Sequence, residues 1–110
     1  MDAPVIDLTI VDDIRGINRE DADVYAELLG IFARDAPARI AGIRSATDAA
    51  GRAGEAHRLR GSSATMGFAR LSQACGALEE ASDAAVADRR ALVDAVVDAY
   101  AEVVLAIRDL

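Results

Sequence analysis

The single histidine of this 110-residue chain, His57, is the side chain best suited to chemistry, and its local sequence is unusual. If the surrounding stretch HRLRGSS is helical, residues three and four positions away share the surface of the histidine. Those positions hold Ala53, Gly54, Arg60 and Gly61. Three of the four carry little or no side chain. The pattern predicts an imidazole on a cleared patch of surface, with one guanidinium beside it.

The glycines of this segment weaken the helix that they belong to. Gly51, Gly54 and Gly61 fall in one predicted element, and each costs about 1 kcal/mol relative to alanine in a helix interior. Close approach of another protein's backbone would offset that cost. Gly54 and Gly61 are therefore candidate partner-docking residues. The alternative is that the glycines are neutral and His57 is an ordinary surface residue, but the local constellation favours docking.

An exposed imidazole beside an arginine supports few reactions in this chain. A metal site needs several ligands, but there is no second histidine and the one cysteine, Cys75, is distant. Ser62 and Ser63 lie around the helix from the ring, which disfavours a serine nucleophile activated by His57. Attack by the neutral imidazole itself remains. Arg60 could then pair with the oxygens of an arriving phosphoryl group.

Length and composition predict one small domain over residues 1–110. Hydrophobic residues make up 53% of the chain, but only 4% of the residues are aromatic. Alanine supplies much of the remainder, and it is both the strongest helix former and small enough for helices to approach closely. An all-α domain is therefore expected.

The charge pattern bears on partners and location. The formal net charge is -7, and all basic residues are arginine, which is typical of a GC-rich bacterial genome. No basic run is present, so nucleic acid is not an expected partner. Neither the N-terminal MDAPVIDL nor the interrupted apolar segment AVVDAYAEVVLAI predicts a secretion signal or a membrane anchor. The lone Cys75 fits a reducing cytoplasm and is interpreted as a buried, small apolar residue.

Hydrophobic spacing in the first half of the chain predicts two helices. A short one covers about residues 8–15. For the second, Asn18 is the expected N-cap, and the expected first turn holds Glu20, Asp21 and Asp23. The apolar stripe of this helix runs through Pro37, so one long helix with a kink is expected. Its stripe is Val24, Leu28, Phe32, Ala36, Ile40 and Ile43.

Three further helices are expected in the second half. Asp48 is the expected cap of the helix that carries His57, and Gly67 is the expected break after it. The core-facing residues predicted for this helix are Arg52, Ala56, Leu59, Ser63 and Met66, which places His57 on the opposite face. The core-facing residues predicted for the next helix are Phe68, Leu71, Cys75, Leu78 and Ser82. A turn is expected at Ser82 and Asp83. The core-facing residues predicted for the last helix are Leu92, Val96, Tyr100, Val103 and Ile107.

Four substantial helices joined by short turns predict an antiparallel four-helix bundle. The short first helix is expected to lie against one end of it.

The segment EAHRLRGSSATMGFARLSQACGALE, residues 55–79, resembles the signature of the histidine-containing phosphotransfer (HPt) domain family. The family usually has lysine where this chain has Arg60, and the exchange keeps the positive charge. The expected helices extend the similarity over essentially the whole chain. The matching positions are Ala56, His57, Leu59, Arg60, Gly61, Ser62, Gly67, Leu71, Cys75, Leu78 and Glu79.

The resemblance implies a covalent phosphoryl carrier of a multistep two-component phosphorelay, without turnover of its own. His57 would accept a phosphoryl group from an aspartyl phosphate on a receiver domain and pass it to another receiver, and a hybrid histidine kinase is a further implied partner. No cofactor is implied for this chain, because the receiver supplies the Mg²⁺ pocket. A monomer is expected.

Docking of the receiver is expected to use apolar side chains near His57, although ordinary packing of the first helix onto the bundle explains them equally well. For Ser62 a local hydrogen bond is favoured over a direct role in transfer. The expected docking residues are Gly54, Gly61, Ala64, Phe68, Ile10 and Ile14, with Ser62 beside them.

Two other classes of function compete with the phosphoryl carrier. The first is a non-transferring adaptor that docks receiver domains and sequesters them. The second is the dimerising region of a sensor kinase, but His57 lacks the acidic residue directly after it and the proline a turn later that such kinases usually show. A receiver domain is excluded by the lack of lysine and of an alternating strand pattern.

Overall fold

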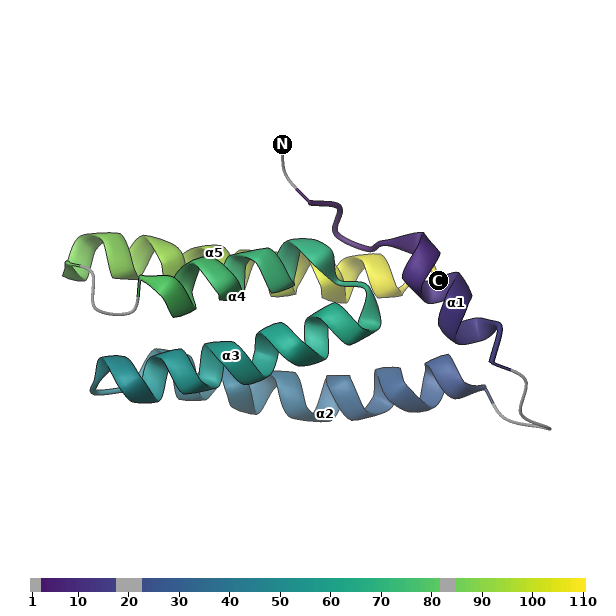
Figure 1. The fold of residues 1–110 in the computed structure, drawn as a ribbon, viewed down its shortest axis with the longest axis horizontal. Helices are drawn as coiled ribbons and strands as arrows, with labels where there is room; N and C mark the ends of the chain where they lie inside the picture. The colour runs from purple at the N-terminus through teal and green to yellow at the C-terminus, as the bar shows by residue number, and fades with distance from the viewer. Residues whose placement is uncertain (1–2, 18–22, 82–84) are drawn as a thin grey trace.

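The computed structural model describes residues 3–17, 23–81 and 85–110, and in these ranges it contains five helices and no strand. The helices are α1 (Leu8–Arg15), α2 (Val24–Ser45), α3 (Ala49–Met66), α4 (Ala69–Glu80) and α5 (Val86–Ile107). Figure 1 shows α2 to α5 running alongside one another as an antiparallel bundle, with α1 at one end. The expected all-α class and bundle are confirmed. Within the described ranges, no helix is long and apolar enough to cross a bilayer.

Helix α1 begins and ends where the sequence predicts. The Asp7 carboxylate accepts the Thr9 N–H at 3.0 Å and caps the helix, and Gly16 follows its last residue. Val11 is buried, and α1 packs against α2 and α3. The segment that precedes α1 is also anchored, because the backbone N–H of Arg70 donates to the Pro4 carbonyl at 2.9 Å. Helix α1 is therefore held on the bundle end by its buried face and by the chain leading into it.

Helix α2 begins later than the sequence suggested. Its N-cap is Asp23, whose carboxylate accepts the Ala26 N–H at 3.0 Å, so Asp23 caps the helix and does not belong to its first turn. The physical reason is that the backbone of Asp23 is extended, and in this conformation its short side chain can accept a hydrogen bond from the backbone N–H three residues later. Asn18, Glu20 and Asp21 lie outside the described residues. The helix continues through Pro37 as one element, as expected.

Helix α3 presents the predicted stripe to the core. Asp48 caps it by accepting the Gly51 N–H at 2.7 Å, and its five buried residues are Arg52, Ala56, Leu59, Ser63 and Met66. The helix ends at Gly67, which has φ +84°, a left-handed conformation that favours glycine. A Cβ at this position would lie 3.0 Å from the Asp7 carbonyl oxygen. The break is thus set by backbone conformation and by the approach of the N-terminal segment.

The remaining helices complete one continuous core. Helix α4 buries Leu71, Cys75 and Leu78, and α5 buries Val96, Ala99 and Val103. Three residues expected in the core of α5 are only half-buried, and they pack at the core's edge: Leu92, Tyr100 and Ile107. Ser82 and Asp83, the expected turn, lie outside the described residues. The rigid core fixes α3 and α4 relative to each other, and the candidate site lies on these two helices.

Candidate functional site

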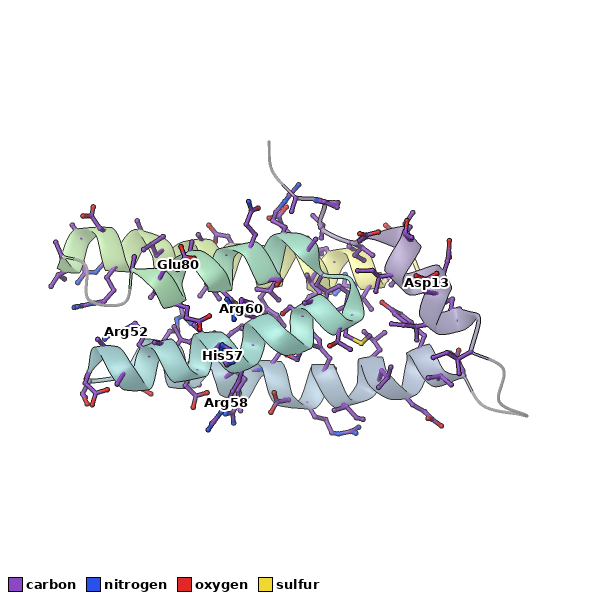
Figure 2. The ribbon with its side chains drawn as sticks, in the orientation of Figure 1. Asp13, Arg52, His57, Arg58, Arg60 and Glu80 are labelled. Atoms are coloured by element: carbon purple, nitrogen blue, oxygen red, sulfur yellow. The ribbon has the colours of Figure 1, made fainter. Side chains whose placement is uncertain are left out.

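His57 points away from the core, as the sequence predicts. It lies midway along α3, and its side chain is 62% exposed. The adjacent residue Ala56 is fully buried, so the helix turns the imidazole outward while its neighbour faces inward. Figure 2 shows the ring between α3 and the viewer, with Arg60 one turn further along and Arg58 on the opposite edge. A partner therefore has access to the imidazole.

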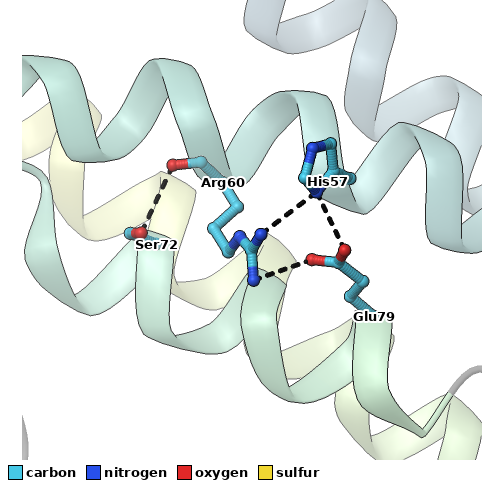
Figure 3. Close-up of polar contacts among 4 residues, drawn as sticks. All are labelled: His57, Arg60, Ser72 and Glu79. Atoms are coloured by element: carbon cyan, nitrogen blue, oxygen red, sulfur yellow. Dashed lines mark hydrogen bonds and ion pairs between the residues drawn. The ribbon is translucent and has the colours of Figure 1, made fainter.

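One nitrogen of the imidazole is held by two charged side chains. His57 Nδ1 lies 2.8 Å from Glu79 Oε1 and 3.1 Å from Arg60 Nη2. The triangle is closed by an ion pair of 3.0 Å between Arg60 Nη1 and Glu79 Oε2 (Figure 3). Glu79 comes from α4, so this arrangement joins the two helices across their interface. The second nitrogen, Nε2, lies on the side of the ring away from both partners.

These contacts favour one tautomer of the neutral ring. A carboxylate can only accept a hydrogen bond, so the contact with Glu79 favours a proton on Nδ1. A guanidinium can only donate hydrogen bonds, and a protonated Nδ1 cannot accept one. With that proton in place, Arg60 therefore donates to Glu79 and not to the ring. The Nδ1–H tautomer leaves the lone pair on Nε2, on the exposed side of the ring. The ring thus has an exposed lone pair on Nε2, and its orientation is held by the contact at Nδ1.

Arg60 reaches its partners by lying across α4. It passes close to Gly76, where a Cβ would lie 3.5 Å from Arg60 Cδ, an ordinary van der Waals contact. The Ser72 hydroxyl donates to the Arg60 backbone carbonyl at 3.3 Å (Figure 3). The Arg60 side chain is 40% exposed, so it borders the solvent beside the imidazole. Its expected role as the charge partner of a phosphoryl group stays a prediction.

The cleared patch expected around His57 is present. Gly54 and Gly61 are both exposed, and a Cβ at either would meet nothing within 4 Å. Neither glycine is therefore required by packing within this chain. The open space is consistent with the approach of another molecule, although the docking role of each residue stays a prediction.

The structure places the four apolar docking candidates differently: two line the same hollow, one is half-buried, and one is completely buried. Ile10 of α1 and the exposed Ala64 of α3 line one hollow of about 310 Å³. Ile14 is half-buried and packs against the core. Phe68 is completely buried and packs edge-to-face on Phe32 at a ring distance of 4.9 Å, so its assignment to the docking surface is wrong. The left-handed Gly67 turns the chain at this corner, and Phe68 is directed into the core.

A second hollow, on the α2 side of α3, escaped the sequence reasoning. It measures about 340 Å³, and its walls include Leu28, Ile31 and Thr65. Ile31 is 55% exposed and lies off the core stripe of α2, which is the sequence feature that could have revealed it. Ser62 also borders this hollow, and its hydroxyl donates to the Leu59 carbonyl at 3.2 Å, which is the local hydrogen bond expected.

The contact between Glu79 and His57 is a feature of the candidate site that the sequence did not predict. Glu79 matches a position of the family signature, but the sequence assigns it no role. The reason is that 22 positions separate it from His57, so no local spacing links the two residues. One helical turn before it, Cys75 is buried, as expected, and burial raises the pKa of its thiol to about 12. Within the described residues, no three potential metal-ligating side chains of the His, Cys, Asp or Glu type gather together.

Comparison with known protein families agrees with this geometry. The sequence profile described as the Hpt domain matches residues 27–106, a range that includes most of α2 and of α5 and all of α3 and α4. The chain therefore belongs to the Hpt domain family, and the resemblance noted from residues 55–79 is confirmed. No curated protein matches the chain in sequence. Helix α1 lies outside the matched range.

The raised pKa of Cys75 predicts an inert thiol in the folded protein. At about pH 8 the folded chain holds almost no thiolate, whereas the unfolded chain holds a substantial fraction. Alkylation by iodoacetamide should therefore be about a thousandfold slower in buffer than in concentrated guanidinium chloride. Mass spectrometry measures the rate directly, because the chain has one cysteine. Comparable rates in the two solvents would show that the thiol beneath the site is accessible.

Proposed function

We propose that this protein carries a phosphoryl group on His57 Nε2, accepting it from the aspartyl phosphate of one receiver domain and passing it to another. Membership of the Hpt domain family indicates involvement in phosphorelay histidine phosphotransfer. The observation that supports the specific assignment is the orientation of the ring, with Nδ1 against Glu79 and Nε2 outward. An exposed nucleophile with a fixed tautomer is what an in-line attack on a partner's phosphorus atom requires.

The transfer step involves one bond made and one broken. The Nε2 lone pair attacks phosphorus while the bond from phosphorus to the aspartyl oxygen breaks, and that oxygen leaves with the electron pair as a carboxylate. The imidazole then carries the phosphoryl group on Nε2 and a proton on Nδ1, so the ring becomes cationic. The Glu79 carboxylate, 2.8 Å from Nδ1, stabilises this developing charge. The reverse attack by a second receiver's aspartate regenerates the neutral ring.

Arg60 provides positive charge close to the incoming group. Its guanidinium already lies 3.1 Å from the ring, so a modest rotation about its half-exposed side chain would bring it to a phosphoryl oxygen. The pairing with Glu79 limits the net charge of the site, which suits a group that must arrive and later depart. Arg60 is thus proposed as the phosphoryl charge partner, and Glu79 as the positioning residue.

The surface around His57 is proposed as the receiver-docking face. Gly54 and Gly61 leave the ring protruding from an otherwise bare stretch of α3. The hollow between Ile10 and Ala64 lies on one side, and the hollow containing Leu28 and Ile31 lies in the groove towards α2. Apolar side chains of a partner could enter both, and burial of such surface would supply most of the affinity.

The assignment of His57 is tested by incubating the protein with a phosphorylated receiver domain. We expect a radiolabelled adduct that is labile to acid and stable to base, and its loss in the His57→Gln variant with unchanged helicity. Arg58→Gln is the matched control, because it changes the adjacent exposed residue and should retain the label. Label persisting in His57→Gln would refute the site. Receiver binding without label in the wild type would support the sequestering adaptor instead.

The role of Glu79 is tested by Glu79→Gln. We expect transfer to slow about tenfold or more with unchanged receiver affinity, because an amide stabilises the cationic ring less well than a carboxylate. Glu102→Gln is the control, since it also removes an ion-paired carboxylate, the partner of Arg70, and does not contact His57. The ¹⁵N spectrum of the single histidine should show Nδ1–H in the wild type and a shift towards Nε2–H in Glu79→Gln. An unchanged tautomer would contradict the positioning role.

The cleared patch is tested by Gly61→Gln. A glutamine side chain at this open position should obstruct the receiver and slow transfer about tenfold or more. Replacing a helix-interior glycine should at the same time raise the free energy of unfolding by about 0.5 kcal/mol. Ala101→Gln, which adds a similar side chain to the exposed surface of α5, should leave transfer unchanged. Equal transfer by wild type and Gly61→Gln would show that the glycine does not serve docking.

A further inference from the structure

The bundle is open along the side where α2 and α5 lie next to each other. Among its four helices, these two are the neighbouring pair that makes the least contact. The Phe32 and Tyr100 rings, 6.4 Å apart, link the two helices. Beside that link, the surface is hollowed by about 470 Å³. The walls of the hollow come from α2 and α5 and are mostly apolar: Pro37, Ile40, Ala41, Arg44, Val97 and Tyr100.

The opening continues towards the start of α5. An arginine-lined hollow of about 370 Å³ lies there, where α2 ends and where α3 and α5 begin. Val86, Arg90 and Val93 of α5 are among its walls. Arg44 borders both hollows, so the two are adjacent. Together they form one groove, which we call the α2/α5 groove.

Helix α5 carries a second apolar stripe besides the one in the core. Its fully buried side consists of Val96, Ala99 and Val103. The second stripe borders the α2/α5 groove, and its residues recur at alternating spacings of four and three: Val86, Arg90, Val93, Val97, Tyr100 and Val104. This spacing, with β-branched side chains, is typical of a seam along which one helix packs on another. Because Val86 is 58% exposed and Val104 39% exposed, the stripe favours a helix packed on it from outside.

Helix α2 presents a shallow surface to the same groove. Ala33, Pro37 and Ala41 are exposed there and lie four residues apart. Small side chains let the axis of a packed helix come close. The groove thus combines a ridge of valines on α5 with a shallow row on α2. A two-fold axis would lay the ridge of each copy on the shallow row of the other, so the surface is self-complementary in shape.

The charges at the groove favour a second copy over an unrelated partner. Asp94 is exposed and lies in sequence between Val93 and Val97, at the edge of the stripe. Arg44 is exposed and borders the hollows that contain these two valines, so it lies at the same height along the bundle. A two-fold axis parallel to the helices preserves that height. It would place Asp94 of each copy beside Arg44 of the other, and opposite charges at the edge of an apolar interface fix its register.

The dimensions of this side suffice for a stable interface. Helix α5 has 22 residues and is therefore about 33 Å long. A band two helices wide, about 20 Å, covers about 650 Å² on each copy, close to the roughly 800 Å² per partner of a standard specific interface. We propose that the chain forms a symmetric homodimer through the α2/α5 groove, with α5 of each copy packed on α2 of the other.

The proposed dimer leaves the candidate site accessible. His57 and Glu79 belong to α3 and α4. Figure 1 shows these two helices in front of α2 and α5, so the groove and the imidazole lie on different sides of the bundle. Each dimer would therefore present two imidazoles, one on either side of the interface. Dimerisation is thus independent of the phosphotransfer proposed for His57.

The dimer is tested by sedimentation velocity of the full chain at physiological ionic strength. Between about 1 µM and 0.5 mM, we expect the mass to rise from 11.5 kDa towards twice that value. Ala41→Glu places a carboxylate in the groove and should weaken association about tenfold or more. Ala38→Glu is the matched control, because it adds the same charge to an exposed position of α2 outside both hollows. Its dissociation constant should stay within about twofold of the wild type.

The pairing of α5 with α2 of the other copy is tested by charge reversal. Asp94→Arg should weaken association about fivefold or more, because it would face Arg44 across the interface. The double variant Asp94→Arg/Arg44→Asp should recover an affinity within about twofold of the wild type. Both positions are exposed, so the fold should tolerate the changes.

Three results would overturn the proposal. The first is a monomeric mass at every concentration, as expected from the sequence, and the second is an equal loss of association in Ala41→Glu and Ala38→Glu. The third is a double variant that associates no better than Asp94→Arg. The His57→Gln variant should dimerise like the wild type. Association is measured without phosphotransfer, so failure of either proposal can be recognised separately.

Discussion

The contact between His57 Nδ1 and Glu79 Oε1 depends on the whole arrangement of α3 and α4. It is formed between residues on different helices, so its geometry is only as good as the packing that sets their relative position. The left-handed Gly67 reverses the chain between the two helices, and Leu78 is fully buried next to Glu79 in sequence. That burial fixes the rotation of α4 and places the carboxylate at the edge of the interface. The Arg60 side chain passes over α4 next to Gly76 and reaches Glu79.

A phosphoryl carrier has to expose its nucleophile and still hold it in one orientation, and these requirements conflict. A freely exposed imidazole samples several rotamers and both tautomers, whereas a buried one cannot meet a partner. Here the side chain is 62% exposed, but one nitrogen is fixed from the α4 side. Small residues clear the opposite side, and they weaken α3 as an isolated helix. The buried stripe of α3 offsets that weakness, because packing contributes more to helix stability than propensity does.

Features that depend on local spacing were predictable from the sequence, and features that depend on contacts between helices were not. The period of α3 correctly separated the buried stripe from His57, and the φ requirement at Gly67 correctly marked its end. The spacing of Phe68 correctly predicted its place on the core-facing stripe, whereas its further assignment to the docking surface was wrong, because the side chain is completely buried. The contact of Glu79 with His57 spans 22 positions. The arginine-lined hollow joins Arg44 to Arg90 across three helices, so no sequence window contains it.

The charge balance beside His57 fits the task proposed for this site. The Arg60 charge is balanced by Glu79, so under the proposed function a phosphoryl group would meet a site of low net charge and would not be trapped there. A carrier needs this balance, because affinity for the group that exceeds the receiver's would stop onward transfer.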